Sequence, residues 1–302
     1  MKLIDSWRGL QTPPQRGDDE VCNPRPIPYE NNIPRRSAAR YVDIGVNLMN
    51  AAFRRDREEV IRAAAAAGVS PLIITGSGER SSLDAVLFAR SFNEHAPASL
   101  YATAGVHPHE AKFCGNRTID FLRELSGSIK AIGECGLDYN RDFSPRDVQR
   151  QWFVKQAELA AELSLPLFLH ERDAFTDFSI ILGEYIKAVP AAVVHCFTGT
   201  GEELDRYLSM GCYIGITGWI CDERRGRHLR ELVKNIPASR LMLETDAPFL
   251  LPRDLPFKVR NKRNEPRFLP HIAETVAACL GKDPEKLAKE VYANTKKFFG
   301  IS

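Results

Sequence analysis

The fold class is clearest in residues 166–195, whose sequence is PLFLHERDAFTDFSIILGEYIKAVPAAVVH. Two short apolar runs, 166–170 and 192–195, each end in a histidine, and a stretch of helical period, 175–187, lies between them. Short apolar runs that alternate with helical stretches are typical of βα units and of a parallel sheet. This segment therefore predicts a strand, a helix and a second strand, with a histidine at the carboxyl end of each strand.

The same alternation continues along the chain from residue 41. It predicts eight strands, at 41–47, 71–75, 101–106, 129–133, 166–170, 192–195, 213–217 and 240–244. It predicts helices at 57–67, 83–93, 119–125, 147–163, 175–187, 202–210, 227–235, 269–280 and 284–292. Eight strands are the number that closes a small barrel. We therefore predict an α/β protein with a (β/α)8 TIM barrel, formed by residues 41–302 as a single domain.

A doubly wound open sheet is the competing architecture. Such a sheet binds its ligand in one crevice, so it would not need polar residues at the ends of many separate strands.

Residues 1–40 differ in composition from the rest of the chain. Six prolines lie among polar residues in this segment: Pro13, Pro14, Pro24, Pro26, Pro28 and Pro34. Proline opposes regular helices and central strands. We therefore expect residues 1–40 to form an irregular N-terminal extension.

Composition sets broad limits on function. The 302 residues are 44% hydrophobic and 26% charged, with a net charge of +2, which is ordinary for a globular protein and identifies no partner. Seven cysteines without a CxxC pair are typical of free thiols in a reducing compartment. No apolar run approaches the roughly 20 residues of a membrane span. We expect no membrane association and no obligate protein partner. The expected location is cytoplasmic or nuclear, with the mitochondrion as an alternative.

Four residues that can bind a metal follow predicted strands. Glu134 follows the fourth strand, His170 and His195 end the fifth and sixth, and Asp246 comes just after the eighth. In a barrel these strand ends converge on one face. Each residue alone could be a hydrogen-bonding or turn residue, but packing explains the set of four poorly, because barrel interiors prefer branched apolar residues. Histidine and carboxylate together suit divalent cations such as Mg²⁺, Mn²⁺ or Zn²⁺.

Further polar residues are expected on the same face. His107 and His109 follow the third strand and could bind a second metal, contact a phosphate or protonate a leaving group. Glu244 lies two residues before Asp246, so it is placed one layer deeper, where it could orient a ligand. The loop 253–267 holds six basic and two acidic residues. It is either a basic rim for a polyanionic substrate or a solvated charged loop.

These residues lie in an ordered series of motifs. The series is DIGVNL at 43–48, GVHPH at 105–109, GECGLDY at 133–139, LH at 169–170, HCFTG at 195–199, ETDAP at 244–248 and RNKRNEP at 260–266. From residue 41 to residue 301 it resembles the TatD family of metal-dependent deoxyribonucleases.

The resemblance implies a barrel enzyme related to the amidohydrolases that hydrolyses DNA phosphodiester bonds with 3′→5′ exonuclease activity. It further suggests a role in DNA repair or DNA fragmentation. It implies that Glu134, His170, His195 and Asp246 hold a divalent cation. Mg²⁺ is the expected metal, with Mn²⁺ or Zn²⁺ as alternatives. His107 and His109 would contact substrate, and Asp246 would also act as general base.

The first strand departs from many relatives, which carry Asp-x-His-x-His there. This chain has Asp43, Gly45 and Asn47 at those positions, so a fixed second metal is not expected. Two alternative functions remain open. One is metal-dependent hydrolysis of another bond, such as the ester of D-aminoacyl-tRNA. The other is a barrel that binds nucleic acid without catalysis.

Overall fold

The structure is a computed structural model that describes residues 40–95, 99–259 and 261–301. The expected N-terminal extension lies outside these residues except for Arg40.

Eight parallel strands form the centre of the described chain. They are β1 (Tyr41–Val46), β2 (Val69–Ile74), β3 (Leu100–Ala102), β4 (Ile132–Asp138), β5 (Leu167–Arg172), β6 (Ala192–Val194), β7 (Tyr213–Ile216) and β8 (Leu241–Leu243). The first three pair in chain order, and so do the last five.

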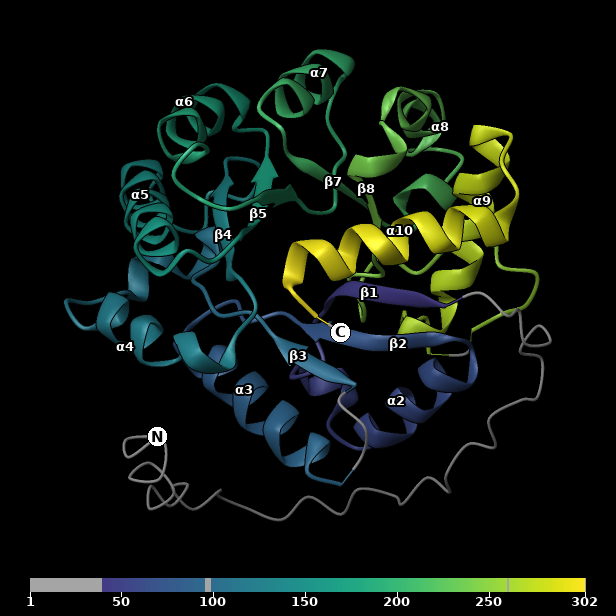
Figure 1. Cartoon of the computed structure of the whole chain (residues 1–302), viewed down its shortest axis with the longest axis horizontal. Coiled ribbons are helices and arrows are strands. Elements are labelled where there is room, and N and C mark those ends of the chain that lie inside the picture. The colour runs from purple at the N-terminus through teal and green to yellow at the C-terminus, as the bar shows by residue number, and fades with distance from the viewer. Residues whose placement is uncertain (1–39, 96–98, 260, 302) are drawn as a thin grey trace. The chain divides into compact units, whose positions relative to one another are not determined.

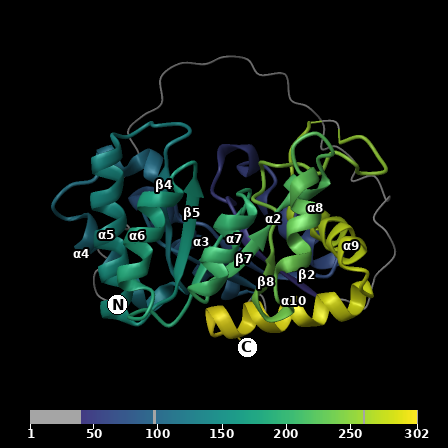
Figure 2. The same cartoon turned by 90° about the horizontal axis from the view of Figure 1, so that it is seen from above.

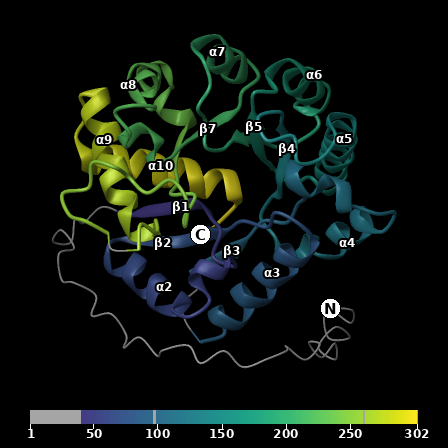
Figure 3. The same cartoon turned by 180° about the vertical axis from the view of Figure 1, so that it is seen from behind.

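Two parallel bridges join these two groups of strands into a ring. Ala104 pairs with Ile132 between β3 and β4, and Val46 pairs with Ala247 between β1 and the end of β8. The amide of Asn47 donates to the carbonyl oxygen of Ala247 at 2.8 Å across the second junction. The strands therefore form a closed barrel (Figures 1 and 3). This confirms the predicted fold class, and the open doubly wound sheet is wrong.

Helices surround the strands (Figure 1). They are α2 (Arg57–Ala66), α3 (Glu79–Asn93), α4 (Thr118–Glu124), α5 (Arg146–Leu163), α6 (Phe175–Tyr185), α7 (Gly201–Ser209), α8 (Arg227–Leu232), α9 (Leu269–Leu280) and α10 (Pro284–Phe299). Short 3-10 turns are η2 (Ala51–Phe53), η3 (Pro108–Phe113), η4 (Ser126–Ser128), η5 (Gly218–Cys221), η6 (Val233–Asn235), η7 (Ala238–Arg240) and η8 (Pro266–Phe268). Among the described residues, no helix combines the length and apolarity that crossing a bilayer requires.

Local sequence explains several helix ends. Gly281 ends α9 in the left-handed conformation with φ of 59°, which glycine adopts without steric cost. Asp283 caps α10 by accepting a hydrogen bond from the amide of Lys286 at 2.9 Å, and Pro284 occupies its first position.

Several predicted boundaries are wrong, and those of β3, β4 and α10 differ most at the strand ends or the C-terminus. The fourth strand runs from Ile132 to Asp138 instead of 129–133, so Glu134 lies within the strand and not after it. The third strand is short and ends at Ala102, and α10 continues to Phe299. The sequence did not indicate the second half of this strand, because the GECGLD segment contains two glycines and glycine is uncommon in strands. Tertiary packing nevertheless buries all seven residues of β4.

The barrel interior is divided along the strands into an apolar and a polar layer. The apolar layer consists of Val42, Ile44, Ile73, Ala131, Phe168, Val193, Tyr213 and Met242, with Phe298, Phe299 and Ile301 packed beneath it. Figure 2 shows α10, whose last residues are Phe298 and Phe299, across one end of the barrel. Two residues beyond Phe168, Val193 and Met242 come His170, His195 and Glu244. Because strand side chains alternate, these polar groups stay on the inner face, nearer the carboxyl ends of the strands.

The cysteines agree with the expectation of free thiols. All six in the described residues are unpaired: Cys114, Cys135, Cys196, Cys212, Cys221 and Cys279. Cys135 packs in the main hydrophobic core, which is separate from the interior cluster, as expected for a residue pointing away from Glu134.

Candidate metal centre

Glu134 is at the centre of a group of imidazoles inside the barrel mouth. Its Oε1 lies 2.7 Å from His195 Nε2, 3.1 Å from His170 Nδ1 and 3.4 Å from His107 Nε2. These residues come from β4, β5, the end of β6 and the loop after β3. The closure of the barrel therefore brings together side chains that are up to 88 residues apart in the sequence.

Charge complementarity shifts the pKa values within this group. Burial alone would raise the pKa of Glu134, but His107, His195 and His170 hold it well below its ordinary value. Burial alone would lower the pKa of His195, but the charges of Glu134 and Glu244 raise it well above its ordinary value. The carboxylates of Glu134 and Glu244 thus make this group a place that favours positive charge, and a cation that bound here would replace the proton of His195, because a ligating imidazole is neutral.

Glu244 orients His195 from the deeper layer, as the strand period predicts. Its Oε2 lies 3.3 Å from His195 Nδ1, which leaves Nε2 directed at Glu134. The backbone amide of Cys196 donates to Glu244 Oε1 at 2.5 Å. A carboxylate behind an imidazole fixes the tautomer and the direction of the other ring nitrogen.

The first-strand departure follows from the position of Glu244. A Cβ atom added at Gly45 would overlap Glu244 Oε2, and one at Gly215 would lie 2.6 Å from Glu244 Oε1. The Glu244 carboxylate therefore occupies the space that a side chain at position 45 would need.

Asp246 lies at the edge of the same group. Its Oδ1 accepts a hydrogen bond from Asn47 Nδ2 at 2.9 Å, and its backbone has a φ of 54°. Burial raises the pKa of Asp246 to about 8, and the negative charges of Glu134 and Glu244 add to this rise, while His195 and His170 oppose it. The left-handed backbone of a non-glycine residue is an uncommon conformation that recurs at functional sites.

His107 and His109 form a rigid turn beside the group. His107 Nδ1 accepts a hydrogen bond from the amide of His109 at 3.1 Å, so Nε2 carries the proton of the neutral ring. Burial lowers the pKa of His107 to about 3, despite the opposing charge of Glu134. His107 is therefore a neutral donor near pH 7.

Asp138 is a site residue that the sequence reasoning missed. Its Oδ2 lies 2.7 Å from His109 Nε2 and 3.3 Å from His170 Nε2. Its Oδ1 accepts hydrogen bonds from the amides of Asn140 and Arg141. The quoted GECGLDY motif contained Asp138, but a strand that ended at Gly133 gave no reason to place it at a strand end.

The donor set fits a divalent cation. One donor atom from each of His107, Glu134 and His170 lies within 4.8 Å of the others, and His195 Nε2 contacts the same carboxylate. One carboxylate with several imidazoles is a set that borderline and hard divalent cations accept. Of the residues predicted to bind metal, the structure groups Glu134, His170 and His195 directly, with Asp246 close enough for their charges to shift its pKa.

The loop 253–267 is only partly the basic rim that its composition indicates. Arg263 is largely buried and pairs with Asp56 at 2.6 Å and Glu265 at 2.7 Å. Arg267 lies 2.9 Å from Glu265, and Arg260 lies outside the described residues. Lys258 and Lys262 are exposed, and so is Arg253. Part of the positive charge therefore anchors the loop, and the remainder can face a ligand.

A second group of potential metal ligands lies at the base of this loop. Cys221, Asp254 and His271 each offer a donor atom within 4.8 Å of the others. His271 Nε2 lies 2.6 Å from Asp254 Oδ1, and Arg230 lies 3.7 Å from Asp254 Oδ2. The Asp254 carboxylate is therefore already paired with His271 of α9 and Arg230 of α8, and these contacts attach the loop to both helices.

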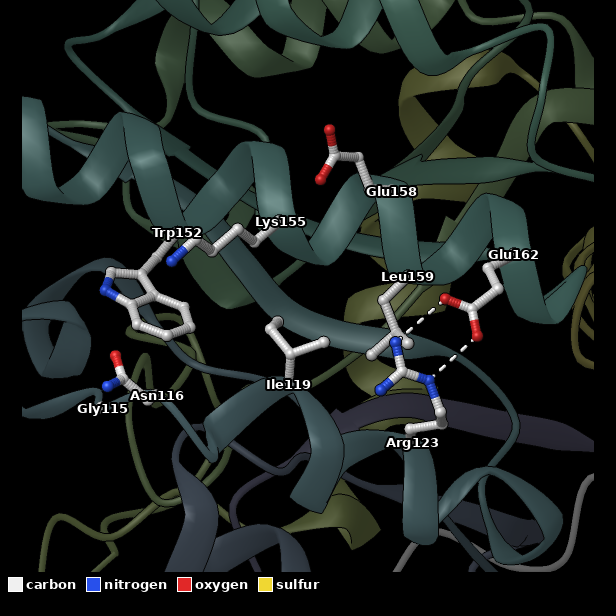
Figure 4. A pocket seen from close by; sticks show the side chains of 9 residues that line it. All are labelled: Gly115, Asn116, Ile119, Arg123, Trp152, Lys155, Glu158, Leu159 and Glu162. Carbon is white, nitrogen blue, oxygen red and sulfur yellow. Dashed lines mark hydrogen bonds and ion pairs between the residues drawn. The ribbon is translucent and has the colours of Figure 1, made fainter.

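A pocket of about 230 Å³ lies apart from the strand ends, between α4 and α5. Figure 4 shows Arg123 and Glu162 facing one another across it, with a separation of 2.9 Å. Lys155 lies over the ring of Trp152 at 4.3 Å. Three charged groups of this pocket therefore already have partners within it: Arg123, Glu162 and Lys155. The residues at the strand ends remain the candidate site.

Comparisons with known proteins agree with this geometry. The sequence model of the family described as TatD related DNase matches residues 42–300. A protein of Rahnella sp. (strain Y9602) named 3'-5' ssDNA/RNA exonuclease TatD is 50% identical over 262 residues, which are 86% of this chain and 98% of that protein. The Escherichia coli (strain K12) protein of the same name is 48% identical over 262 residues, 86% of this chain and 99% of its own length.

A solved structure is similar as well. It is a hydrolase TatD family protein from Entamoeba histolytica, with a TM-score of 0.79 and 26% identity, covering 87% of this chain and 99% of that one.

Proposed function

Since the chain belongs to the family of TatD-related DNases, we propose that it is a metal-dependent nuclease that removes nucleotides from the 3′ end of single-stranded DNA or RNA. The observation that carries this proposal is the convergence of three imidazoles on Glu134 at the carboxyl ends of the strands. The names of relatives about half identical to this chain supply the substrate class and polarity. A part in DNA repair or DNA fragmentation remains a prediction.

We expect Glu134, His170, His195 and Asp246 to hold the divalent cation. Mg²⁺ is the first metal to test, because it is the usual partner of phosphate substrates. The number of imidazoles favours tighter binding of Mn²⁺ or Zn²⁺. When bound, the cation would supply Lewis-acid activation of water and of a phosphate oxygen.

Asp246 is the proposed general base. Its pKa of about 8 falls when positive charge is placed beside it, so the loaded site would hold it as the carboxylate that accepts a proton from water. Asn47 fixes one of its oxygens by a hydrogen bond of 2.9 Å, which limits the directions in which the other can act.

The turn of His107 and His109 is the proposed contact for the scissile phosphate. His107 would donate a hydrogen bond from Nε2 as a neutral ring. Asp138 holds both His109 and His170 in place and would keep these rings from rotating when a phosphate enters.

Replacing His170 by alanine tests the metal centre. We expect His170→Ala to abolish release of nucleotides from a 3′-labelled single strand and to lower metal content, while circular dichroism stays unchanged. His95→Ala, an exposed histidine after α3, is the matched control and should behave as the native chain. EDTA should stop the native enzyme and excess metal should restore it. Full activity of His170→Ala would contradict the proposal.

Two other functions are tested by the same preparation. Hydrolysis of aminoacyl-tRNA esters or simple amides without nuclease activity would favour a hydrolase of another bond. Nucleic-acid binding that ignores EDTA, without turnover, would favour a non-catalytic barrel. A cytoplasmic or nuclear location and the lack of an obligate protein partner stay predictions.

A further inference from the structure

Exposed phenylalanines gather on the face of the barrel that carries the metal centre. Five large apolar side chains are exposed in the described residues: Leu87, Phe113, Phe143, Ile180 and Phe249. Leu87 and Ile180 lie on the outer helices α3 and α6, and single exposed aliphatics of this kind are ordinary. The three phenylalanines instead lie on the segments that follow β3, β4 and β8, with exposed fractions of 71%, 53% and 52%.

Phe143 is held rigidly beside the proposed phosphate contact. Its ring centre lies 4.7 Å from that of His109, at an angle of 58°. The next residue, Ser144, is fully buried, and its hydroxyl donates to the His109 carbonyl oxygen at 3.0 Å and accepts from the Lys112 amide at 3.1 Å. The backbone therefore fixes an exposed aromatic ring against the histidine turn.

Phe249 stands next to the proposed general base. Its amide donates to the carbonyl oxygen of Asp246 at 3.0 Å, which closes the turn after β8. The amide of Asn264 donates to the carbonyl oxygen of Pro248 at 3.1 Å and supports this turn from the opposite side. The backbone that carries the exposed Phe249 ring is thus fixed next to Asp246, and the Phe143 ring lies against His109.

Rings fixed in this way match the chemistry of an unpaired nucleotide. A base has two apolar faces, and these stack on an aromatic side chain whatever the nucleotide sequence. A paired base at the end of a duplex already stacks on its neighbour and pairs with its partner, so it cannot take this position without being separated.

We propose that Phe143 and Phe249 stack on the unpaired bases next to the scissile phosphodiester and so select single-stranded 3′ ends. The inference rests on the proposed nuclease function and adds to it the residues that recognise the single strand. Lys112, whose ammonium lies 5.0 Å from the centre of the Phe113 ring, belongs to the same 3-10 turn as His109 and adds an exposed positive charge to that segment.

The test pairs two substrates with two variants. One substrate is a single-stranded oligonucleotide, and the other has the same length with abasic sugars at its last three positions. For Phe143→Leu and Phe249→Leu we expect kcat/KM on the first substrate to fall about tenfold to a hundredfold, the range that base stacking allows. On the abasic substrate the native enzyme should already be slow, and each variant should match it. Ile180→Ala, a matched exposed apolar residue, should equal the native enzyme on both substrates.

Two outcomes would overturn the stacking role. An equal loss on both substrates would mean that the rings support the histidine turn or the Asp246 turn and do not touch bases. An unchanged kcat/KM on both substrates would mean that the rings do not contribute to this reaction or that they contact another partner, such as a protein.

Failure of the nuclease function itself gives a different result. In that case the native enzyme degrades neither substrate, and the affinity for each strand tests the stacking role instead. Fluorescence anisotropy should then give tenfold or greater weakening for Phe143→Leu on the normal strand and no change on the abasic strand. Equal affinity on both strands would refute it.

Discussion

At the scale of single residues, Gly45 leaves the space that the Glu244 carboxylate occupies. The Glu244 carboxylate lies against Gly45 and Gly215, where an added Cβ would collide with it. From there it reaches His195 Nδ1 at 3.3 Å. The two glycines therefore leave room for a buried carboxylate behind His195.

Glu244→Gln tests this orienting role. The amide keeps the shape of the side chain but removes its charge, so His195 becomes a weaker base and a weaker ligand. Loss of such a supporting carboxylate typically lowers metal affinity or activity roughly tenfold to a hundredfold. Calorimetric titration with Mn²⁺ and the nuclease rate should both report this loss.

The matched control is Glu171→Gln, in a carboxylate whose hydrogen bonds come from the Tyr207 hydroxyl and the Ala174 amide and not from an imidazole. Its metal affinity should equal that of the native enzyme. Native affinity and rate in Glu244→Gln would show that Glu244 only fills space.

At the scale of elements, part of the positive charge of the loop after β8 anchors the loop, which neither the basic rim nor the solvated loop predicted from the sequence includes. Arg263 donates to both carboxylate oxygens of Asp56, at 2.9 and 2.6 Å, and to the carbonyl oxygen of Ala52 at 2.6 Å. It thereby joins this loop to η2 and to the start of α2. The sequence shows how many positive charges this loop carries, but only the contacts in the structure show which of them are already neutralised by carboxylates.

Arg263→Met should therefore destabilise the protein. Removing Arg263 leaves Asp56 without this largely buried partner and Glu265 with Arg267 alone, which costs about 3 kcal/mol. In a chain of this size that corresponds to a fall in Tm of several degrees, measured by thermal unfolding followed by circular dichroism. Lys262→Met, at the exposed neighbour, should change Tm by less than a degree or so. A Tm shift equal to that of Lys262→Met would contradict the structural role of Arg263.

At the scale of the whole molecule, closure of the barrel creates the site. Glu134, His170 and His195 meet because parallel strands place their carboxyl ends on one face, and the bridges at Val46 and Ala104 complete the ring. The described residues close this ring without any contribution from residues before Arg40. The curated relatives match 86% of this chain with nearly their full length. We therefore propose that residues 41–302 are the complete catalytic domain.

Deleting residues 1–39 tests this division. The shortened chain should keep the nuclease rate within about twofold and the Tm within a degree or two, because the barrel core and the metal-facing residues remain. The full-length protein, measured in the same buffer and with the same metal, is the reference. Loss of activity with an unchanged Tm would assign residues 1–39 to substrate binding, and aggregation would assign them to the core.

The sequence by itself determined the eight βα units and the polar residues at the strand ends, since both depend on local periodicity. It also indicated the free thiols and the deeper position of Glu244, which follow from spacing and strand alternation. Tertiary structure alone decided that β4 continues to Asp138 and that Arg263 is neutralised. It also decided that Glu244 takes the space beside Gly45. These features depend on contacts between residues distant in the chain, and such contacts leave no period in the sequence from which they could be predicted.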